Sequence, residues 1–185
     1  MSPQPDSWIK KHAVEAKMIE PFAHELVRDG VISFGVSSYG YDFRLDETFK
    51  EPVINAIDPL DPKDMNAYEF KSFQTKKPFH IKPHSILIAQ SLEYFKIPRN
   101  ILGICFGKST YARSGLLVNI TPLEPEWEGR LTFPLINFSS YPIKIYPLEG
   151  IAQLIFLESN TVCETSYADR KGKYQNQKEI TLSKV

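Results

Sequence analysis

The chain has 185 residues, of which 42% are hydrophobic and 24% are charged, so its composition is that of one folded domain and not of a disordered segment. Lysine and arginine together number 22, as do aspartate and glutamate, and this balance argues against a nucleic-acid-binding or membrane-surface protein. No apolar run reaches the length of a membrane-spanning helix, and the N-terminus lacks a signal-peptide pattern, so we expect a cytoplasmic protein without a membrane partner.

The first 30 residues predict a helical N-terminal segment, 1–30. Asp6 or Ser7 can cap a first short helix that runs towards Met18. Pro21 suits the first turn of a second short helix, which Gly30 would end.

From residue 31 the chain changes to short runs of β-forming residues separated by turn residues. Extended segments are expected at 31–34, 41–45, 86–90, 101–106, 116–120, 131–138, 143–146 and 151–157. Many of the 14 prolines lie between these runs. This pattern favours a mainly β sandwich or barrel over βαβ units, and we interpret residues 1–185 as a single domain that ends in a polar tail, residues 165–185.

Residues 108–113 predict a helix of one or two turns between Gly107 and Gly115. In such a helix Ser109 and Arg113 share a face, where a hydroxyl, a guanidinium and N-terminal amides could receive a phosphate group. A capped surface helix without a ligand explains the same residues, and it is the favoured interpretation when they are considered alone.

The acidic turn, residues 123–129, contains Glu124, Glu126 and Glu128. Three carboxylates this close could hold Mg²⁺ or orient a water molecule. A solvent-exposed turn over Trp127 is the simpler interpretation of this segment, and the residues of the turn alone favour it.

The tail concentrates aromatic, basic and amide side chains around Gly172. They are Tyr167, Arg170, Lys171, Lys173, Tyr174 and Gln177. A solvated basic tail is the usual meaning of such a segment, but the aromatic and amide groups favour a flap that closes over a ligand.

A zinc site is not expected, because Cys105 and Cys163 are far apart in the chain and no Cys-x-x-Cys or His-Glu-x-x-His pattern occurs. His80 and His84 flank a proline in a β-like segment, so surface histidines are the favoured interpretation there.

Several longer motifs occur in a fixed order along nearly the whole chain. They are Trp8-Ile9, Met18–Phe22, Ser37–Asp42, Glu93–Asn100, Gly107–Arg113, Asn119–Gly129, Glu149–Gln153 and Gly172–Gln175. In this combination the sequence resembles the dCTP deaminase family of the trimeric dUTPase-like superfamily. The resemblance implies a mainly β, distorted dUTPase-like barrel with short N-terminal helices and a flexible C-terminal tail, assembled as a homotrimer with active sites between subunits.

The resemblance also implies that the protein hydrolyses dCTP to dUTP and ammonia in pyrimidine deoxynucleotide biosynthesis, with Mg²⁺ bound to the triphosphate and without zinc. Ser109 would orient the water and the amino group of the base, and Arg113 would bind and polarise the substrate. The implied substrate-binding residues are Lys108, Ser109, Thr110, Tyr111, Ala112, Arg113, Glu124, Thr132, Phe133, Pro134, Gln153, Tyr167, Lys173 and Gln177, the last three in a tail that closes over the triphosphate.

One position departs from the family pattern. The family's catalytic glutamate, the general base, lies five residues after the glycine that ends the acidic turn, and counting from Gly129 this position is Pro134. Proline can neither accept nor deliver a proton, and losing a general base typically costs about 10²–10⁴ in rate. Because proline also lacks a backbone donor, we expect the local strand to be altered here.

Four explanations for the proline are open. Another acid, Glu124 or Glu126, could supply the base; the chain could instead cleave dCTP or dUTP to the monophosphate with Glu124 and Mg²⁺; it could bind nucleotide without catalysis; or the proline could be an artificial change of the sequence. The intact family motifs favour dCTP deamination, and the phosphate motifs predict nucleotide binding in every case.

Overall fold

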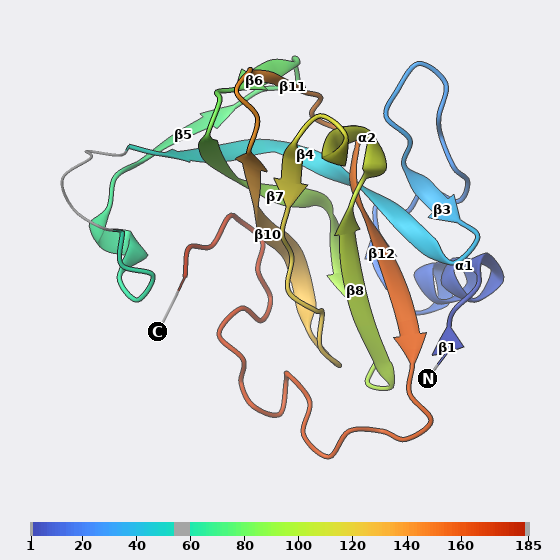
Figure 1. Cartoon of the computed structure of the whole chain (residues 1–185). Helices are drawn as coiled ribbons and strands as arrows, with labels where there is room; N and C mark the ends of the chain where they lie inside the picture. Colours follow the sequence, from blue (N-terminus) through green and yellow to red (C-terminus); the bar gives the residue numbers. More distant parts are fainter. Residues whose placement is uncertain (1, 54–59, 184–185) are drawn as a thin grey trace.

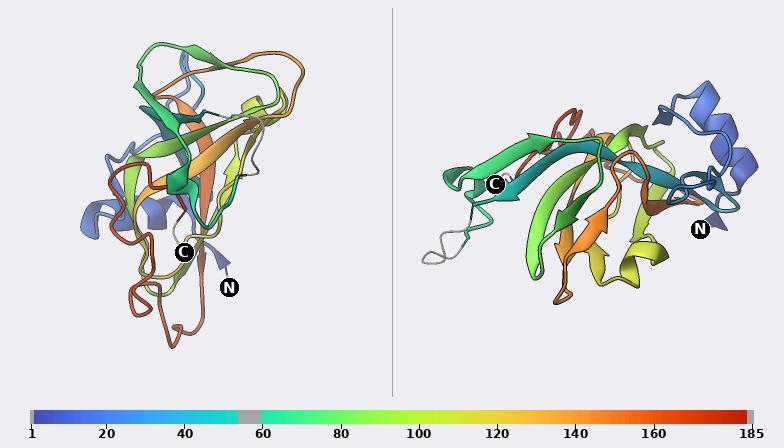
Figure 2. Two further views of the ribbon diagram at one scale, coloured as in Figure 1. Left: turned by 90° about the vertical axis from the view of Figure 1, so that its left-hand side faces the viewer. Right: turned by 90° about the horizontal axis from the view of Figure 1, so that it is seen from above.

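The computed structural model describes residues 2–53 and 60–183, which fold around one strongly curled sheet (Figures 1 and 2). The strands are β1 (Ser2–Pro3), β2 (Ile19–Glu20), β3 (Gly35–Ser37), β4 (Gly40–Pro52), β5 (Phe70–Gln74), β6 (Phe79–Ile81), β7 (Ser85–Lys96), β8 (Ile101–Gly107), β9 (Leu116–Val118), β10 (Glu128–Asn137), β11 (Ile143–Ile145) and β12 (Gly150–Glu158). The helices are α1 (Asp6–Glu15), α2 (Ser109–Ala112) and the 3₁₀ turn η1 (Met65–Ala67).

The central path of the sheet runs β1-β12-β4-β7-β10-β9. Strand β8 pairs with β12, β3 and β5 pair with β4, β2 pairs with β7, and β6 forms a separate pair with β11. The ladders between these strands are antiparallel. The predicted mainly β architecture is therefore confirmed, and the curl of the sheet encloses its own apolar core (Figure 2).

Aromatic rings hold the three central strands in register. Phe43 of β4 meets Phe95 of β7 and Phe133 of β10 edge-on, with ring centroids 5.8 Å apart in both pairs. All three side chains are fully buried or nearly so. Edge-to-face pairs of this kind add to the free energy gained from burial alone.

The N-terminal segment 1–30 contains one of the two predicted helices. Helix α1 forms, but the predicted cap at Asp6 or Ser7 is wrong, because the helix begins at Asp6, its N-cap is Pro5 and no side chain caps it. The prediction of the second helix is wrong. Val27 exchanges two backbone hydrogen bonds with Phe34, 2.8 and 3.0 Å long, so its amide and carbonyl do not form the hydrogen bonds of a helix. None of the helices that the structure describes is long and apolar enough to cross a membrane.

The predicted extended segments overlap strands, except for 31–34, which contributes only an isolated bridge at Phe34. Strands β1, β2, β3, β5 and β6 were not predicted. Their sequences are short, and β5 alternates too weakly between apolar and polar residues to be recognised before its partner β4 is known. The predicted short helix at 108–113 forms as α2.

A buried ion pair joins the two longest strands, β4 and β7. The fully buried carboxylate of Glu93 accepts hydrogen bonds from Arg44 Nε at 2.7 Å, the Arg44 amide at 2.9 Å and the Tyr41 hydroxyl at 3.3 Å. Burial raises the pKa of Glu93, and the Arg44 guanidinium opposes that rise. Arg44 also donates to the carbonyl of Pro21, so the pair ties the N-terminal segment to the sheet.

Replacing Glu93 with glutamine should lower the free energy of unfolding by about 3–5 kcal/mol, because it leaves the Arg44 guanidinium without its buried counter-charge. Urea unfolding at neutral pH, followed by circular dichroism, measures the change. Glu15→Gln, at an exposed position, is the matched control and should shift stability by no more than about 0.5 kcal/mol. Equal effects of the two substitutions would contradict a structural role for the pair.

Candidate active site

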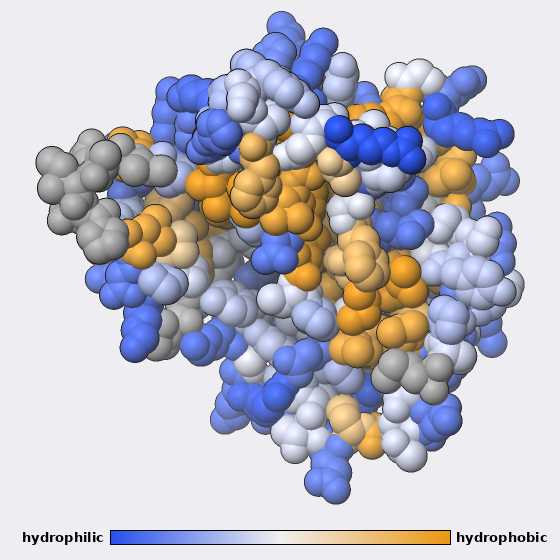
Figure 3. All heavy atoms as spheres, viewed as in Figure 1, coloured by the Kyte–Doolittle hydropathy of each residue, from blue (hydrophilic) through white to orange (hydrophobic). Residues whose placement is uncertain are grey.

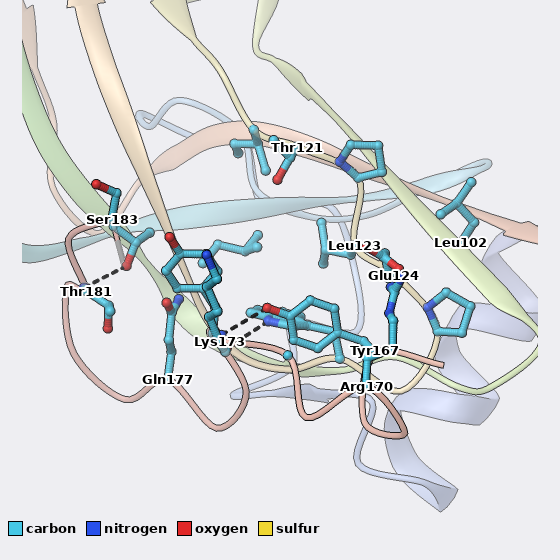
Figure 4. Close-up of a pocket in the computed structure, with 18 of the residues that line it drawn as sticks. Leu102, Thr121, Leu123, Glu124, Tyr167, Arg170, Lys173, Gln177, Thr181 and Ser183 are labelled. Carbon is cyan, nitrogen blue, oxygen red and sulfur yellow. Dashed lines mark hydrogen bonds and ion pairs between the residues drawn. The ribbon is translucent and has the colours of Figure 1, made fainter. Parts of the chain in front are cut away.

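A hollow of about 1110 Å³ lies between β10, the start of β8, the acidic turn and the tail (Figure 4). Its apolar lining includes Leu102, Ile120, Leu123, Trp127, Leu131, Pro134 and Tyr167, and its polar lining includes Glu124, Thr132, Arg170, Lys173, Gln177, Thr181 and Ser183. A largely apolar wall with a few convergent polar groups is the usual composition of a small-molecule site.

From Thr132 onward, the alternation of side chains along β10 decides which residues face the hollow, whereas Leu131, at the irregularity between Arg130 and Thr132, lines it as well. Thr132 and Pro134, two of the predicted substrate-binding residues, are half-buried and line it. Phe133, between them, is 1% exposed and packs on Phe43 in the core. Neighbouring residues of a strand point to opposite faces, so the Phe133 side chain faces the core and not the hollow, contrary to its predicted contact with the substrate.

Pro134 does not interrupt β10. The register between β10 and β7 is continuous from Thr132 to Asn137, and its irregularity lies earlier, between Arg130 and Thr132. The local alteration expected from a proline inside a strand is not seen at this position.

The direction of the backbone explains why the proline is tolerated. The amide of Phe138 donates away from β7, to the carbonyl of Gly115 at 3.0 Å. Because amides alternate in direction along a strand, the nitrogen of Pro134 faces that same side. Strand β9 lies on that side but pairs with β10 only from Leu135 onward, so the missing donor removes no bond from either ladder.

Hydrogen bonds join the tail to the acidic turn and to β10. The indole Nε1 of Trp127 donates to the carbonyl of Tyr174 at 2.9 Å, and the Tyr174 amide donates to the Tyr167 hydroxyl at 2.9 Å. Arg130 and Gln177 exchange two further hydrogen bonds of 2.8 Å. The structure thereby brings Tyr167, Lys173 and Gln177 together in the lining of one hollow (Figure 4).

Glu124 is the one acidic residue among the described residues that line the hollow, and no histidine accompanies it. Its carboxylate forms an ion pair with the guanidinium of Arg170. Lys173 lines the same hollow. The site therefore combines two cationic side chains with a single group, Glu124, that could act as a proton acceptor.

Helix α2 does not line the hollow. Leu102, near the start of β8, lies in its wall, whereas α2 follows the opposite end of that strand, about 20 Å away at the usual rise of a strand. The α2-segment residues Ser109, Thr110, Ala112 and Arg113 are exposed. Tyr111 is buried, and its hydroxyl accepts the Tyr146 amide at 3.0 Å, so the predicted substrate contact of the Tyr111 side chain is also corrected.

Lys108 and Gln153, both predicted to bind the nucleotide, lie outside the hollow as well. The Lys108 ammonium lies 2.5 Å from the Asp42 carboxylate and 2.9 Å from the Ser33 hydroxyl, with 11% of its side chain exposed. Gln153 donates to the Ser37 hydroxyl at 3.0 Å. Within this chain, Lys108 is therefore paired with the Asp42 carboxylate and does not point into the hollow.

Four residues that line the hollow are not among those predicted from the sequence, namely Leu102, Leu131, Thr181 and Ser183. The Thr181 amide donates to the Thr132 hydroxyl at 3.2 Å, which brings the last part of the tail to β10. No local pattern marks these residues, because their position depends on where the tail crosses the sheet.

No cluster of three or more histidine, cysteine, aspartate or glutamate side chains that could hold a metal ion occurs within residues 2–53 and 60–183.

The fold and the hollow define a mainly β protein with a small-molecule site under its C-terminal tail. Residues 4–159 match the dCTP deaminase-like family, and the chain belongs to that family. It is 50% identical over 187 aligned residues to a dCTP deaminase of Paramagnetospirillum magneticum, and 50% identical over 189 to one of Pseudomonas syringae pv. syringae, with all of both chains covered in each case.

The fold is also similar to a crystal structure of 2′-deoxycytidine 5′-triphosphate deaminase from Agrobacterium tumefaciens, with a TM-score of 0.64 and 14% identity. The alignment covers 84% of this chain and 47% of that one, so the chain spans about half the length of this structural relative.

Substituting Gly172 with alanine should loosen the tail. An added Cβ would lie 2.1 Å from Cε1 of Tyr167, so the ring would have to move and would lose its hydrogen bond from the Tyr174 amide. We expect amide exchange at residues 174–177 to become roughly tenfold faster, the effect of losing about one hydrogen bond. Exchange in β7 of the same sample is the internal control, and unchanged exchange in the tail would contradict this packing.

Proposed function

We propose that the protein is a cytoplasmic, homotrimeric dCTP deaminase that hydrolyses dCTP to dUTP and ammonia in the hollow. The observation that carries the proposal is the tail, which holds Tyr167, Arg170 and Lys173 over a largely apolar hollow in a chain 50% identical to dCTP deaminases along its full length. The apolar wall suits a flat pyrimidine, and a guanidinium with an ammonium suits a triphosphate.

Mg²⁺ would arrive with the triphosphate and neutralise part of its charge. The residues of the hollow fit a nucleotide-borne ion and not a metal site built by the protein, because Glu124 is the one carboxylate among its described lining and is paired with Arg170. The chain itself contributes Arg170 and Lys173 as phosphate partners.

Glu124 is the proposed general base, since Pro134 cannot serve as one. When the triphosphate draws Arg170 away, the Glu124 carboxylate becomes free to take a proton from the attacking water. The water oxygen forms a bond to C4 of the pyrimidine while the electrons of the C4=N3 double bond move to N3, which takes the proton from Glu124. Glu124 then takes the remaining proton of the new hydroxyl and passes it to the amino nitrogen, so that C4=O forms, the bond from C4 to that nitrogen breaks and ammonia leaves.

A second copy of the chain would complete the site. Ser109 and Arg113 are exposed on α2 and do not line the hollow of their own chain, so they are available to a neighbouring one. Large apolar side chains are exposed near α2, with Phe106 at 58%, Leu117 at 44% and Phe138 at 64%. Apolar surface also gathers in the middle of the face seen in Figure 3, as an interface between copies requires.

Pro134 favours a second candidate function, which is nucleotide binding without deamination. Proline leaves the hollow intact, because β10 keeps its register, but it cannot take up a proton at the position where the family resemblance implies a catalytic glutamate. Binding through Arg170 and Lys173 would survive this loss.

Product analysis of the chain with dCTP and Mg²⁺ separates these functions. We expect slow formation of dUTP by the unmodified chain, and we expect Pro134→Glu to be faster by about 10²–10⁴, because it restores a base beside the pyrimidine. Chromatography that resolves dCTP, dUTP, dCMP and dUMP gives the rate and the product. Pro134→Gln, which has the shape of the glutamate but not its charge, is the matched control.

Formation of dUTP by Pro134→Glu alone would establish the second candidate, and dCMP from the unmodified chain would establish cleavage of the triphosphate. The absence of any product with both chains, together with no binding of dCTP, would contradict both proposed functions.

A further inference from the structure

Arg99 lies in the turn between β7 and β8 and does not line the hollow. Its guanidinium nevertheless has the largest set of polar contacts near the site. Nη1 lies 2.5 Å from the Glu126 carboxylate in the acidic turn, and Nη2 lies 2.7 Å from the Asp169 carboxylate in the tail. Nη2 also donates to the carbonyl of Glu164 at 3.2 Å. One side chain thus joins three segments that are far apart in the sequence.

The Asp169 end of this contact organises the beginning of the tail. The Asp169 carboxylate also accepts the Ser166 amide at 3.0 Å, and the Ser166 hydroxyl accepts the Asp169 amide at 3.2 Å. The hydrogen bond from Arg99, with those from Ser166, lowers the pKa of Asp169 to about 2, so the carboxylate is ionised at neutral pH. The turn that follows carries Arg170 into the hollow.

The Glu126 end organises the acidic turn. Glu126 has a positive φ of 62°, a backbone conformation that a non-glycine residue needs outside support to hold. Its amide donates to the Ile97 carbonyl at 3.1 Å, while its side chain is held by Arg99. Glu124 lies two residues earlier in the same turn, so Arg99 fixes the turn that presents it to the hollow.

Arg99 also prevents a repulsion. Both the Glu126 and the Asp169 carboxylates contact the Arg99 guanidinium. Without this cation between them, the two negative charges would face each other and repel. A cation with two donor directions between the two carboxylates therefore stabilises the closed arrangement of the tail and the acidic turn, and an arginine provides this better than a lysine.

We propose that Arg99 is a positioning residue for nucleotide binding, which sets the tail and the acidic turn in the arrangement that receives the triphosphate. This inference rests on the proposed function of the hollow. It assigns to Arg99 the closing of the site and no contact with the substrate.

The test compares Arg99→Met with Arg99→Lys, and uses Arg28→Met, at an exposed arginine, as the matched control. In the protein without nucleotide, Arg99→Met should make amide exchange at residues 174–177 about tenfold faster, while the melting temperature changes by only a few degrees. The Kd for dCTP with Mg²⁺, measured by calorimetry, should rise about tenfold, a modest effect because both ion pairs are partly exposed to solvent.

Arg99→Lys should recover part of both effects, because a lysine can still reach one carboxylate, and Arg28→Met should change neither. Asp169→Asn, which removes only the tail half of the contact at an exposed position, should reproduce the faster exchange even where Arg99→Met fails to fold. The rise in KM should exceed any fall in kcat, because Arg99 touches neither the substrate nor the reacting atoms.

Unchanged exchange in the tail, or a loosened tail with an unchanged Kd, would overturn the proposal. The exchange measurement needs no nucleotide. A failure of the unmodified chain to bind dCTP would therefore count against the proposed function alone, while the role of Arg99 in holding the tail would still be decided.

Discussion

The two-residue alternation of β10 is the constraint on which the rest of the site depends. Phe133 and Leu135 are buried in the core, while Thr132 and Pro134 face the hollow from the same strand. The core fixes the register of β10 against β7, and that register fixes which side chain stands at each position of the hollow. A change at Pro134 can therefore alter the chemistry of the site without altering the fold, whereas a slip by one residue would exchange the core and the site.

Several cationic side chains form ion pairs within the chain. Arg170, which lines the hollow, is paired with Glu124. Arg99, which does not line it, is paired with Glu126 and Asp169, and Lys108, also outside it, is paired with Asp42. A triphosphate would enter by competing with a carboxylate for Arg170, so binding of the nucleotide and release of Glu124 would be the same event.

The sequence predicted the parts of the fold and the site that local patterns encode. Short β-forming runs divided by proline indicated the strands, and the cluster of aromatic and basic residues indicated the tail as a flap. The second N-terminal helix was wrong because Val27 bonds to Phe34, which no local pattern shows. The side chains of Phe133 and Tyr111 were predicted to contact the substrate because they belong to motifs of consecutive residues. In the folded chain only alternate residues of a strand, or one face of a helix, point to the same side, and these two side chains are buried.

Whether dCTP binds in the hollow under the tail can be measured directly by the NMR signal of the indole N–H of Trp127. Trp127 lies in the hollow and donates to the tail at Tyr174, whereas Trp8, the other of the two tryptophans, is stacked on His12 in α1. In a titration of the ¹⁵N-labelled chain with dCTP and Mg²⁺, followed by NMR, the account predicts a saturable shift of the Trp127 signal and an unmoved Trp8 signal. If the Trp127 signal stays in place at millimolar dCTP, or only Trp8 moves, the hollow is not the nucleotide site.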